Sequence, residues 1–298
     1  MANMLLQVDP SLINLRALEE KERTPRHLAS EAGKSVSMIN LLLGHRADAA
    51  LMTSGLKLTP LDNFISNQRT ELNVEILKVL LGATKKVGYV VFSSDKWNVL
   101  HYATTRAAVL DAKSLPGHLL LQNLATLPDM KPLVASNSSV GWTPLHLASH
   151  FVDYTTVKLQ VEEFDARVDA RIPKNGSAFD TVLERARQFP NGLHGADSLR
   201  RWSRLAYRSA LFLQEKLEAI EGPYHLTSLH IAAYMAHYEE VVRLAREDSK
   251  AVFETNWDDE TPHQMLQNTL PVNISGEWAV RFRNIAVLRA APRYWSCD

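Results

Sequence analysis

A short phrase returns along this chain and restricts the folds that are open to it. Its clearest copy reads Gly141-Trp142-Thr143-Pro144-Leu145-His146-Leu147-Ala148-Ser149. Related copies begin at these positions of the sequence: Thr24, Thr59, Asn98, Ser177, Thr227 and Thr261. A phrase that recurs in this way predicts a stack of similar units, not a globule with one closed core.

Each residue type in the phrase has a physical reason. Thr143 can cap a following helix, because its hydroxyl accepts from a free backbone N–H. Pro144 suits the first helical position, where no N–H is needed. Ala148 and Ser149 are small, so helices of a neighbouring unit can approach closely. The phrase therefore predicts a capped helix at every copy.

The phrase and its spacing together resemble the ankyrin repeat family from about Leu5 to about Asn268. From one copy to the next the steps are 35, 39, 45, 34, 50 and 34 residues, and three of them lie near the roughly 33-residue ankyrin period. The resemblance implies an all-α solenoid of helix-turn-helix units joined by hairpin loops. It also implies hydrogen bonds that link neighbouring turns, held by the phrase histidines His27, His101, His146 and His230.

The resemblance predicts a single ankyrin-repeat domain over residues 1–298, with about six to seven degenerate repeats. Residues 1–22 form a partial N-terminal unit, residues 23–268 the repeats, and residues 269–298 a C-terminal capping helix with its flanks. The N-terminal segment is open to two interpretations. It is either a truncated capping unit or a cut made in a longer protein.

The third and fifth units are too long, which predicts insertions near residues 111–139 and 188–220. A helix with four leucines, followed by a loop, is expected in the first insertion. In the second, a helix is expected from Ser198 to about Ile220, ended by Gly222-Pro223. Its apolar residues recur at helical spacing and predict one apolar face that includes Ile220. Insertions of this kind often project on the binding side of a repeat protein.

Composition excludes several classes of function. The formal net charge is +0, so nothing in the bulk chain attracts nucleic acid. No apolar run reaches the roughly 18 residues of a membrane span. The single cysteine, Cys297, allows no intrachain disulfide and no cysteine metal cluster. These features predict an intracellular, cytoplasmic protein without cofactor. No catalytic signature is present, and the spacing of His225, His230 and His237 is not that of a zinc helix.

Arginines line one side of the helix expected in the second insertion. Arg200, Arg204 and Arg208 are spaced by four residues, with Arg201 beside them. Like charges at this spacing oppose each other by a few tenths of a kcal/mol per pair. The stripe is either a solvated face, with arginines paired to Glu184 or other acids, or a docking site for an acidic partner or an anionic ligand.

Aromatic residues are the second candidate for a binding surface. Trp97 and Trp142 directly precede the capping residue of their copies, near the hairpins. The pairs His150-Phe151 and Tyr234-Met235 fall where inner helices of the family face the concave groove. Rings and methionines are frequent in binding hot spots. The alternative is that these side chains only pack.

Two functions follow. The first is a non-enzymatic protein–protein interaction module that binds another protein on the concave face through the six residues just named. The alternative is an enzyme or small-molecule binder, for example a biosynthetic cyclase or isomerase. Its pocket would be formed by the groove and the insertions and lined by His150, Tyr234, Met235 and Arg204. The oligomeric state and the identity of the partner stay open.

Overall fold

The structure is a computed structural model. It describes residues 7, 9–17, 22–54, 58–66, 73–83, 96–109, 115–126, 130–173, 176–188, 196–224, 226–235 and 237–268. Over these ranges the regular structure is all α-helix and 3-10 helix, without a β-strand. Two isolated antiparallel bridges, Ala17 with Arg23 and Ile172 with Gly176, close hairpins. The predicted all-α class is therefore confirmed.

The chain divides into two compact units, each of which is described by itself. Unit 1 comprises Met1–Phe151 and Leu159–Ala166, and unit 2 comprises Val152–Lys158 and Arg167–Asp298. The boundary passes through helix α10 (Tyr154–Glu162). The prediction of one continuous repeat domain stays a prediction.

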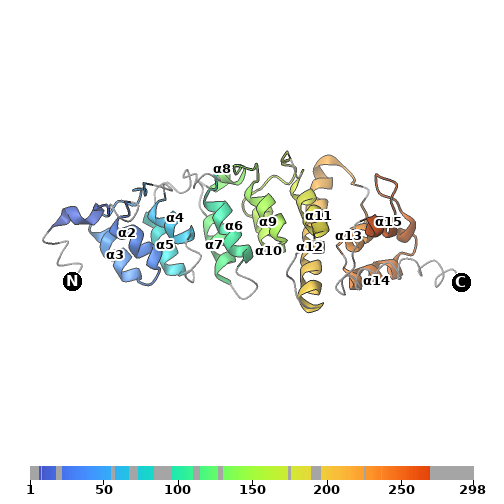
Figure 1. Ribbon diagram of the computed structural model, residues 1–298, viewed down its shortest axis with the longest axis horizontal. Coiled ribbons are helices and arrows are strands. Elements are labelled where there is room, and N and C mark those ends of the chain that lie inside the picture. The colour runs from blue at the N-terminus through green and yellow to red at the C-terminus, as the bar shows by residue number, and fades with distance from the viewer. Residues whose placement is uncertain are drawn as a thin grey trace. The chain divides into compact units, whose positions relative to one another are not determined.

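Unit 1 is built from short helices that pack in two series. Its elements are η1 (Pro10–Asn14), α2 (Pro25–Ala32), α3 (Val36–Gly44), α4 (Pro60–Ser66), α5 (Val74–Ala83), α6 (Val99–Val109), α7 (Leu115–Ala125), α8 (Lys131–Val134) and α9 (Pro144–Phe151). Helix α2 packs on α4, α4 on α6 and α6 on α9, while α3 packs on α5 and α5 on α7 (Figure 1). Leu61, Leu100 and Leu145 of the phrase are fully buried between these helices.

Unit 2 places a long helix among short ones. Its elements are α11 (Ala178–Gln188), α12 (Ala196–Glu221), α13 (Ser228–Tyr234), α14 (Tyr238–Glu247), η4 (Ala251–Phe253) and α15 (Pro262–Asn268). Helix α13 contacts α11, α12, α14 and α15 (Figure 1). The buried side chains include Phe179, Leu213, Leu217 and Ile231.

The helices that follow the phrase start with reciprocal caps, as the sequence predicts. In α13 the Thr227 hydroxyl accepts from the His230 N–H, while the His230 ring accepts from the Thr227 N–H. The same exchange starts α2 at Thr24 and His27. Each pair satisfies two backbone donors that a helix N-terminus otherwise leaves free.

The hairpins before the phrase share one backbone feature. The residue two positions before the cap has a left-handed φ at Glu22 (56°), Lys96 (53°), Gly141 (89°) and Asp259 (56°). Only one of these is a glycine, although glycine adopts this conformation at least cost. At Glu22, Lys96 and Asp259 the left-handed conformation therefore occurs without a glycine to indicate it in the sequence.

Both helices that were predicted in the insertions are present, but some details differ from the prediction. Helix α7 supplies the first, with Leu120, Leu121 and Leu124 buried, but the loop expected after it contains the short helix α8. Helix α12 supplies the second. Ala206, Ala210, Leu213 and Leu217 of the predicted apolar face are buried, whereas Ile220 at its end is 59% exposed. The C-terminal cap over residues 269–298 lies outside the described residues.

None of the helices in the described ranges combines the length and the apolar character that crossing a bilayer requires.

Candidate functional site

Phrase histidines connect segments that lie far apart in the sequence. The Nε2 atoms of His27, His101 and His230 lie 2.9, 2.9 and 3.1 Å from the carbonyl oxygens of Leu58, Trp142 and Glu260. Because Nδ1 accepts from the cap N–H, Nε2 carries the proton and donates to that carbonyl. Burial lowers the pKa of all three imidazoles, which keeps them neutral. The expected link between turns is confirmed at these three positions.

Other residues replace histidine at the same position and keep only the cap. Asp62, Asp180 and Gln264 each accept from the backbone N–H and the hydroxyl of their capping residue, at 2.6 to 2.9 Å. The two carboxylates have no proton with which to donate onward, and the printed bonds of the Gln264 side chain use only its amide oxygen within the described residues. The cap is therefore common to the phrase, and the onward link belongs to histidine.

Five ring side chains of unit 1 form two contacting groups, which we together call the aromatic cluster: Trp97 with Tyr102, and Trp142 with His150 and Phe151. The Trp97 ring lies 5.2 Å from Tyr102 and stacks on His101 at 6.1 Å. The Trp142 ring lies 4.8 Å from His150, whose ring lies 5.5 Å from Phe151. The two groups are joined because His101 donates to the Trp142 carbonyl.

The aromatic cluster is accessible from solvent at its edge. All five of its side chains are half-buried. Val140, in the hairpin that carries Trp142, is 67% exposed. Four residues predicted from the sequence, namely Trp97, Trp142, His150 and Phe151, thus belong to the aromatic cluster. Sequence reasoning missed Tyr102 and Val140. Tyr102 follows the phrase histidine directly, where the other copies have Leu28, Leu147 and Ile231.

The pair Tyr234 and Met235 behaves differently from its equivalent, His150 and Phe151. Helix α9 includes Phe151, whereas α13 ends at Tyr234 and Met235 is its C-cap. Tyr234 is half-buried, but Met235 is completely buried. The prediction that the Met235 side chain contacts a partner is therefore wrong, because it has no surface to offer.

The arginine stripe is exposed along α12, and two of its members have partners in unit 2. The Arg204 guanidinium lies 3.4 Å from the Glu239 carboxylate, with both side chains mostly exposed. The Arg208 guanidinium lies 4.2 Å above the Tyr154 ring. Exposed ion pairs contribute little stability, and cation–π contacts at such sites about 0.5–1 kcal/mol. The arrangement favours the solvated-face interpretation, with Glu239 as the acid that pairs with Arg204.

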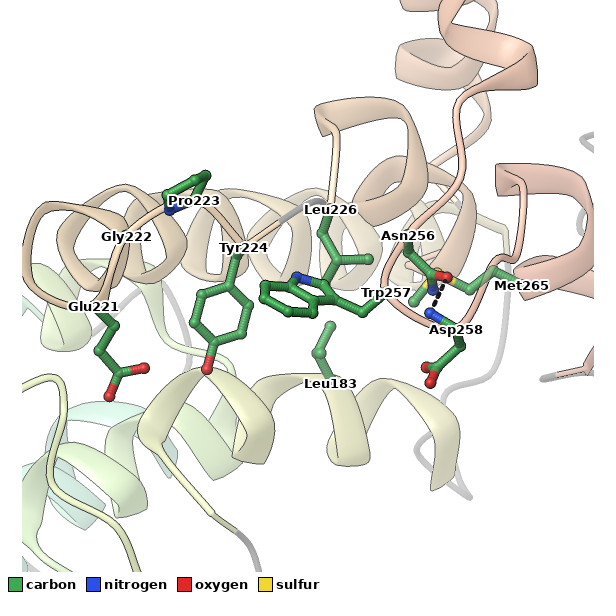
Figure 2. A pocket seen from close by; sticks show the side chains of 10 residues that line it. All are labelled: Leu183, Glu221, Gly222, Pro223, Tyr224, Leu226, Asn256, Trp257, Asp258 and Met265. Carbon is green, nitrogen blue, oxygen red and sulfur yellow. Dashed lines mark hydrogen bonds between the residues drawn. The ribbon is translucent and has the colours of Figure 1, made fainter.

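Unit 2 contains a pocket that was not predicted from the sequence. Its volume is about 520 Å³, and its wall includes Leu183 of α11, Leu226, Trp257 and Met265. Figure 2 shows the Trp257 indole near its middle, with the Tyr224 ring beside it. This volume falls within the range of known ligand sites. The one visible hint in the sequence is Trp257 itself, a tryptophan placed in a hairpin.

Most of the pocket wall is apolar, and its charged groups are acidic. Glu221 and Asp258 lie toward opposite sides (Figure 2), and the described residues that line the pocket include no lysine, arginine or histidine. Arg171 binds Glu221 at 2.9 Å and approaches the Tyr224 hydroxyl at 3.5 Å. The residues expected to line an enclosed pocket, His150, Tyr234, Met235 and Arg204, do not line this one.

Within the described ranges, no three His, Cys, Asp or Glu side chains gather as they would around a metal ion. His225 lies outside those ranges.

Comparison with known proteins adds little. No protein-family model matches the sequence, and no curated protein is similar to it. A chain in the solved complex of the predatory endopeptidase Bd0816 from Bdellovibrio bacteriovorus with the immunity protein Bd3460 is similar to this one. The identity is 19% and the TM-score 0.48, over 72% of this chain and 90% of that chain. A similarity this distant carries no conclusion about function.

Proposed function

We propose that this chain is a degenerate ankyrin-repeat protein that acts as a non-enzymatic protein–protein interaction module. The recurrent phrase, its caps and the onward histidine bonds support the repeat assignment. They occur at matching positions, and each bond spans 30 to 41 residues. Repeat units that stack on their neighbours create extended binding surfaces.

The observation that carries the proposal is the aromatic cluster of unit 1. Tryptophan and tyrosine are enriched in binding hot spots because they bury a large area with few rotatable bonds. Here Trp97 and Trp142 occupy equivalent places in consecutive copies of the phrase. His101, completely buried between them, fixes the second to the first. Such a preorganised surface loses little conformational entropy when it binds.

A capture experiment with matched variants tests the proposal. The intact chain, Val140→Glu, Phe151→Ala and a control, Ile220→Glu, are used as baits in native lysate after circular dichroism has shown that each is folded. Val140 and Ile220 are similarly exposed β-branched residues, and they receive the same charge. We expect one set of proteins to be retained by the intact chain and the control, and lost by Val140→Glu and Phe151→Ala. Equal retention by all four baits, or by none, contradicts the proposal.

The pocket of unit 2 is the specific observation in favour of the alternative, a small-molecule binder or enzyme. Pockets of this size with apolar walls commonly hold small ligands. Native mass spectrometry of the purified chain tests it: a bound small molecule that Trp257→Ala loses would favour this alternative.

A further inference from the structure

The centre of the unit 2 pocket offers an apolar side chain a place to bind. Leu183, Leu226 and Met265 contribute wall, and Tyr224 and Trp257 contribute rings. Trp257 is 70% exposed, the largest exposed fraction among the big apolar side chains described. Covering this indole would remove a large apolar surface from water, which favours binding.

The acidic residues at the two ends of the pocket differ in whether a cation neutralises their charge. Glu221 is paired, since Arg171 binds its carboxylate at 2.9 Å. The Asp258 side chain is exposed, and so is that of Asp259, which follows it in the same hairpin. The negative potential therefore concentrates at the Asp258 end. A cationic group on the occupant is favoured there and would be of no advantage at the other end.

The hairpin that carries Trp257 and Asp258 is fixed by its own hydrogen bonds. The Asn256 side-chain oxygen accepts from the N–H groups of Asp258 and Glu260, both at 2.9 Å. The Asn256 N–H donates to the Glu260 carbonyl, and that same residue's carbonyl accepts from His230. The bonds at Asp258 involve its backbone, so its carboxylate can be changed without removing them.

We propose that this pocket binds a segment of a partner polypeptide, which inserts one apolar side chain beside Trp257 and places a lysine or arginine opposite Asp258. This inference rests on the proposed function as a protein-binding module and adds a second, chemically defined site to it. A polypeptide fits better than a small molecule. Small ligands are largely enclosed by their sites, whereas the exposed Trp257 face needs a larger partner to cover it.

Selection of short random peptides displayed on phage tests the chemistry, with the full chain as target. Parallel selections use Asp258→Lys, and Glu254→Lys as the matched control, because Glu254 is exposed in the same region but does not line the pocket. We expect the intact chain and Glu254→Lys to enrich peptides with an apolar residue near lysine or arginine. Asp258→Lys should instead enrich acidic residues there. For the best peptide, Trp257→Ala should weaken binding about tenfold or more, as at other hot spots.

Several results would overturn the inference. They are no enriched peptide, a consensus without basic residues, and the same consensus on Asp258→Lys. Peptides that depend on Val140 and Phe151 but tolerate Trp257→Ala would also overturn it, and the proposed function would then stand. If neither peptides nor lysate proteins bind, both this inference and the proposed function fail.

Other occupants are identified by two further measurements. A small molecule seen by native mass spectrometry and lost in Trp257→Ala would place that molecule in the pocket. A photoreactive phenylalanine derivative at Tyr224 that cross-links to residues 269–298 of the same chain would place the chain's own C-terminal segment there. Either result overturns the inference.

Discussion

At the scale of single residues, Asp62 shows what a carboxylate costs in the place of a histidine. It is buried at 2% exposure and accepts only from Thr59. Burial raises the pKa of this carboxyl to about 6, although the Thr59 hydrogen bonds oppose the shift. The folded chain therefore binds a proton between about pH 4 and pH 6 that the unfolded chain has already released.

Because the folded state holds the extra proton, stability contributed by Asp62 falls as pH rises through this window and is lowest above about pH 6. We expect Asp62→Asn, which keeps an accepting oxygen, to gain roughly 2–3 kcal/mol relative to the natural chain between pH 4 and pH 7. Urea unfolding of both proteins at the two pH values measures the gain. The buried histidines titrate in both proteins and cancel in the difference.

Asp180→Asn is the matched control. It makes the same change at the same position of the phrase, but Asp180 is only half-buried. A difference between the natural chain and Asp62→Asn that is constant over this pH range would contradict the prediction.

Arg26 is the least compatible residue with its position in the phrase. Other copies have Leu61, Leu100, Leu145 and Leu229 there, all buried. Arg26 is 1% exposed, one nitrogen donates to the Ala47 carbonyl at 3.3 Å, and the other two nitrogens make no hydrogen bond with any residue that the structure describes. Burial lowers the pKa of its guanidinium. A buried charge with unmade hydrogen bonds opposes folding.

We expect Arg26→Leu to stabilise the chain by about 1–4 kcal/mol, because an apolar side chain of similar bulk replaces the buried charge. Arg26→Ala should gain less, since it removes the charge but leaves a cavity. Urea midpoints of the two variants and the natural chain measure the effect. A lower midpoint for Arg26→Leu would show that the guanidinium stabilises the fold.

At the scale of elements, the cap explains how much of the fold could be predicted. Helix starts such as Pro25, Pro144 and Ser228 follow from the cap residue before them, since this signal is local in sequence. The residue at which α12 stops packing against other helices depends on contacts that are distant in sequence, so no local signal predicts it. Its periodicity predicts which residues share a face, but Ile220 extends past the packing partners and is exposed.

The candidate site was predictable only in part, for a related reason. Trp97 and Trp142 could be placed on hairpins by their distance from the cap. The burial of Met235 depends on α13 ending one residue earlier than α9 does relative to its cap. The pocket requires contributions from α11, the end of α12 and two later segments. The contacts between these segments cannot be predicted from the spacing of residues in the sequence.

The link between elements can be measured apart from the cap by a pair of substitutions. His101→Asn keeps an oxygen that can accept from the Asn98 N–H but loses the bond to the Trp142 carbonyl. His101→Ala loses both. Because a lost hydrogen bond of this kind typically costs about 0.5–1.5 kcal/mol, and a lost cap about 1 kcal/mol, we expect unfolding free energies to fall in the order natural chain, Asn, Ala. Urea unfolding gives the three values.

The control for this pair is Asp180→Ala, which removes a cap where no onward bond exists. If His101→Asn were as stable as the natural chain, the onward bond would contribute nothing. The aromatic cluster would then be held by packing alone.

At the scale of the whole molecule, the two candidate binding sites lie in different units. Unit 1 carries the aromatic cluster, and unit 2 carries the pocket with its acidic hairpin. The formal net charge of +0 hides this difference, because composition averages over the chain while recognition depends on local groups. The neutral total is therefore compatible with a site that selects a basic partner.

The histidine position also has a consequence for how such a chain diverges. Codons for aspartate and glutamine each differ from a histidine codon by a single base. Asp62, Asp180 and Gln264 are thus one nucleotide change away from the phrase residue, and all three retain the helix cap. Point mutation at this position discards the bond to the next segment while it leaves the start of the helix intact. A gene of this kind can lose the hydrogen bonds between its repeats one at a time, without passing through a variant whose helices cannot form.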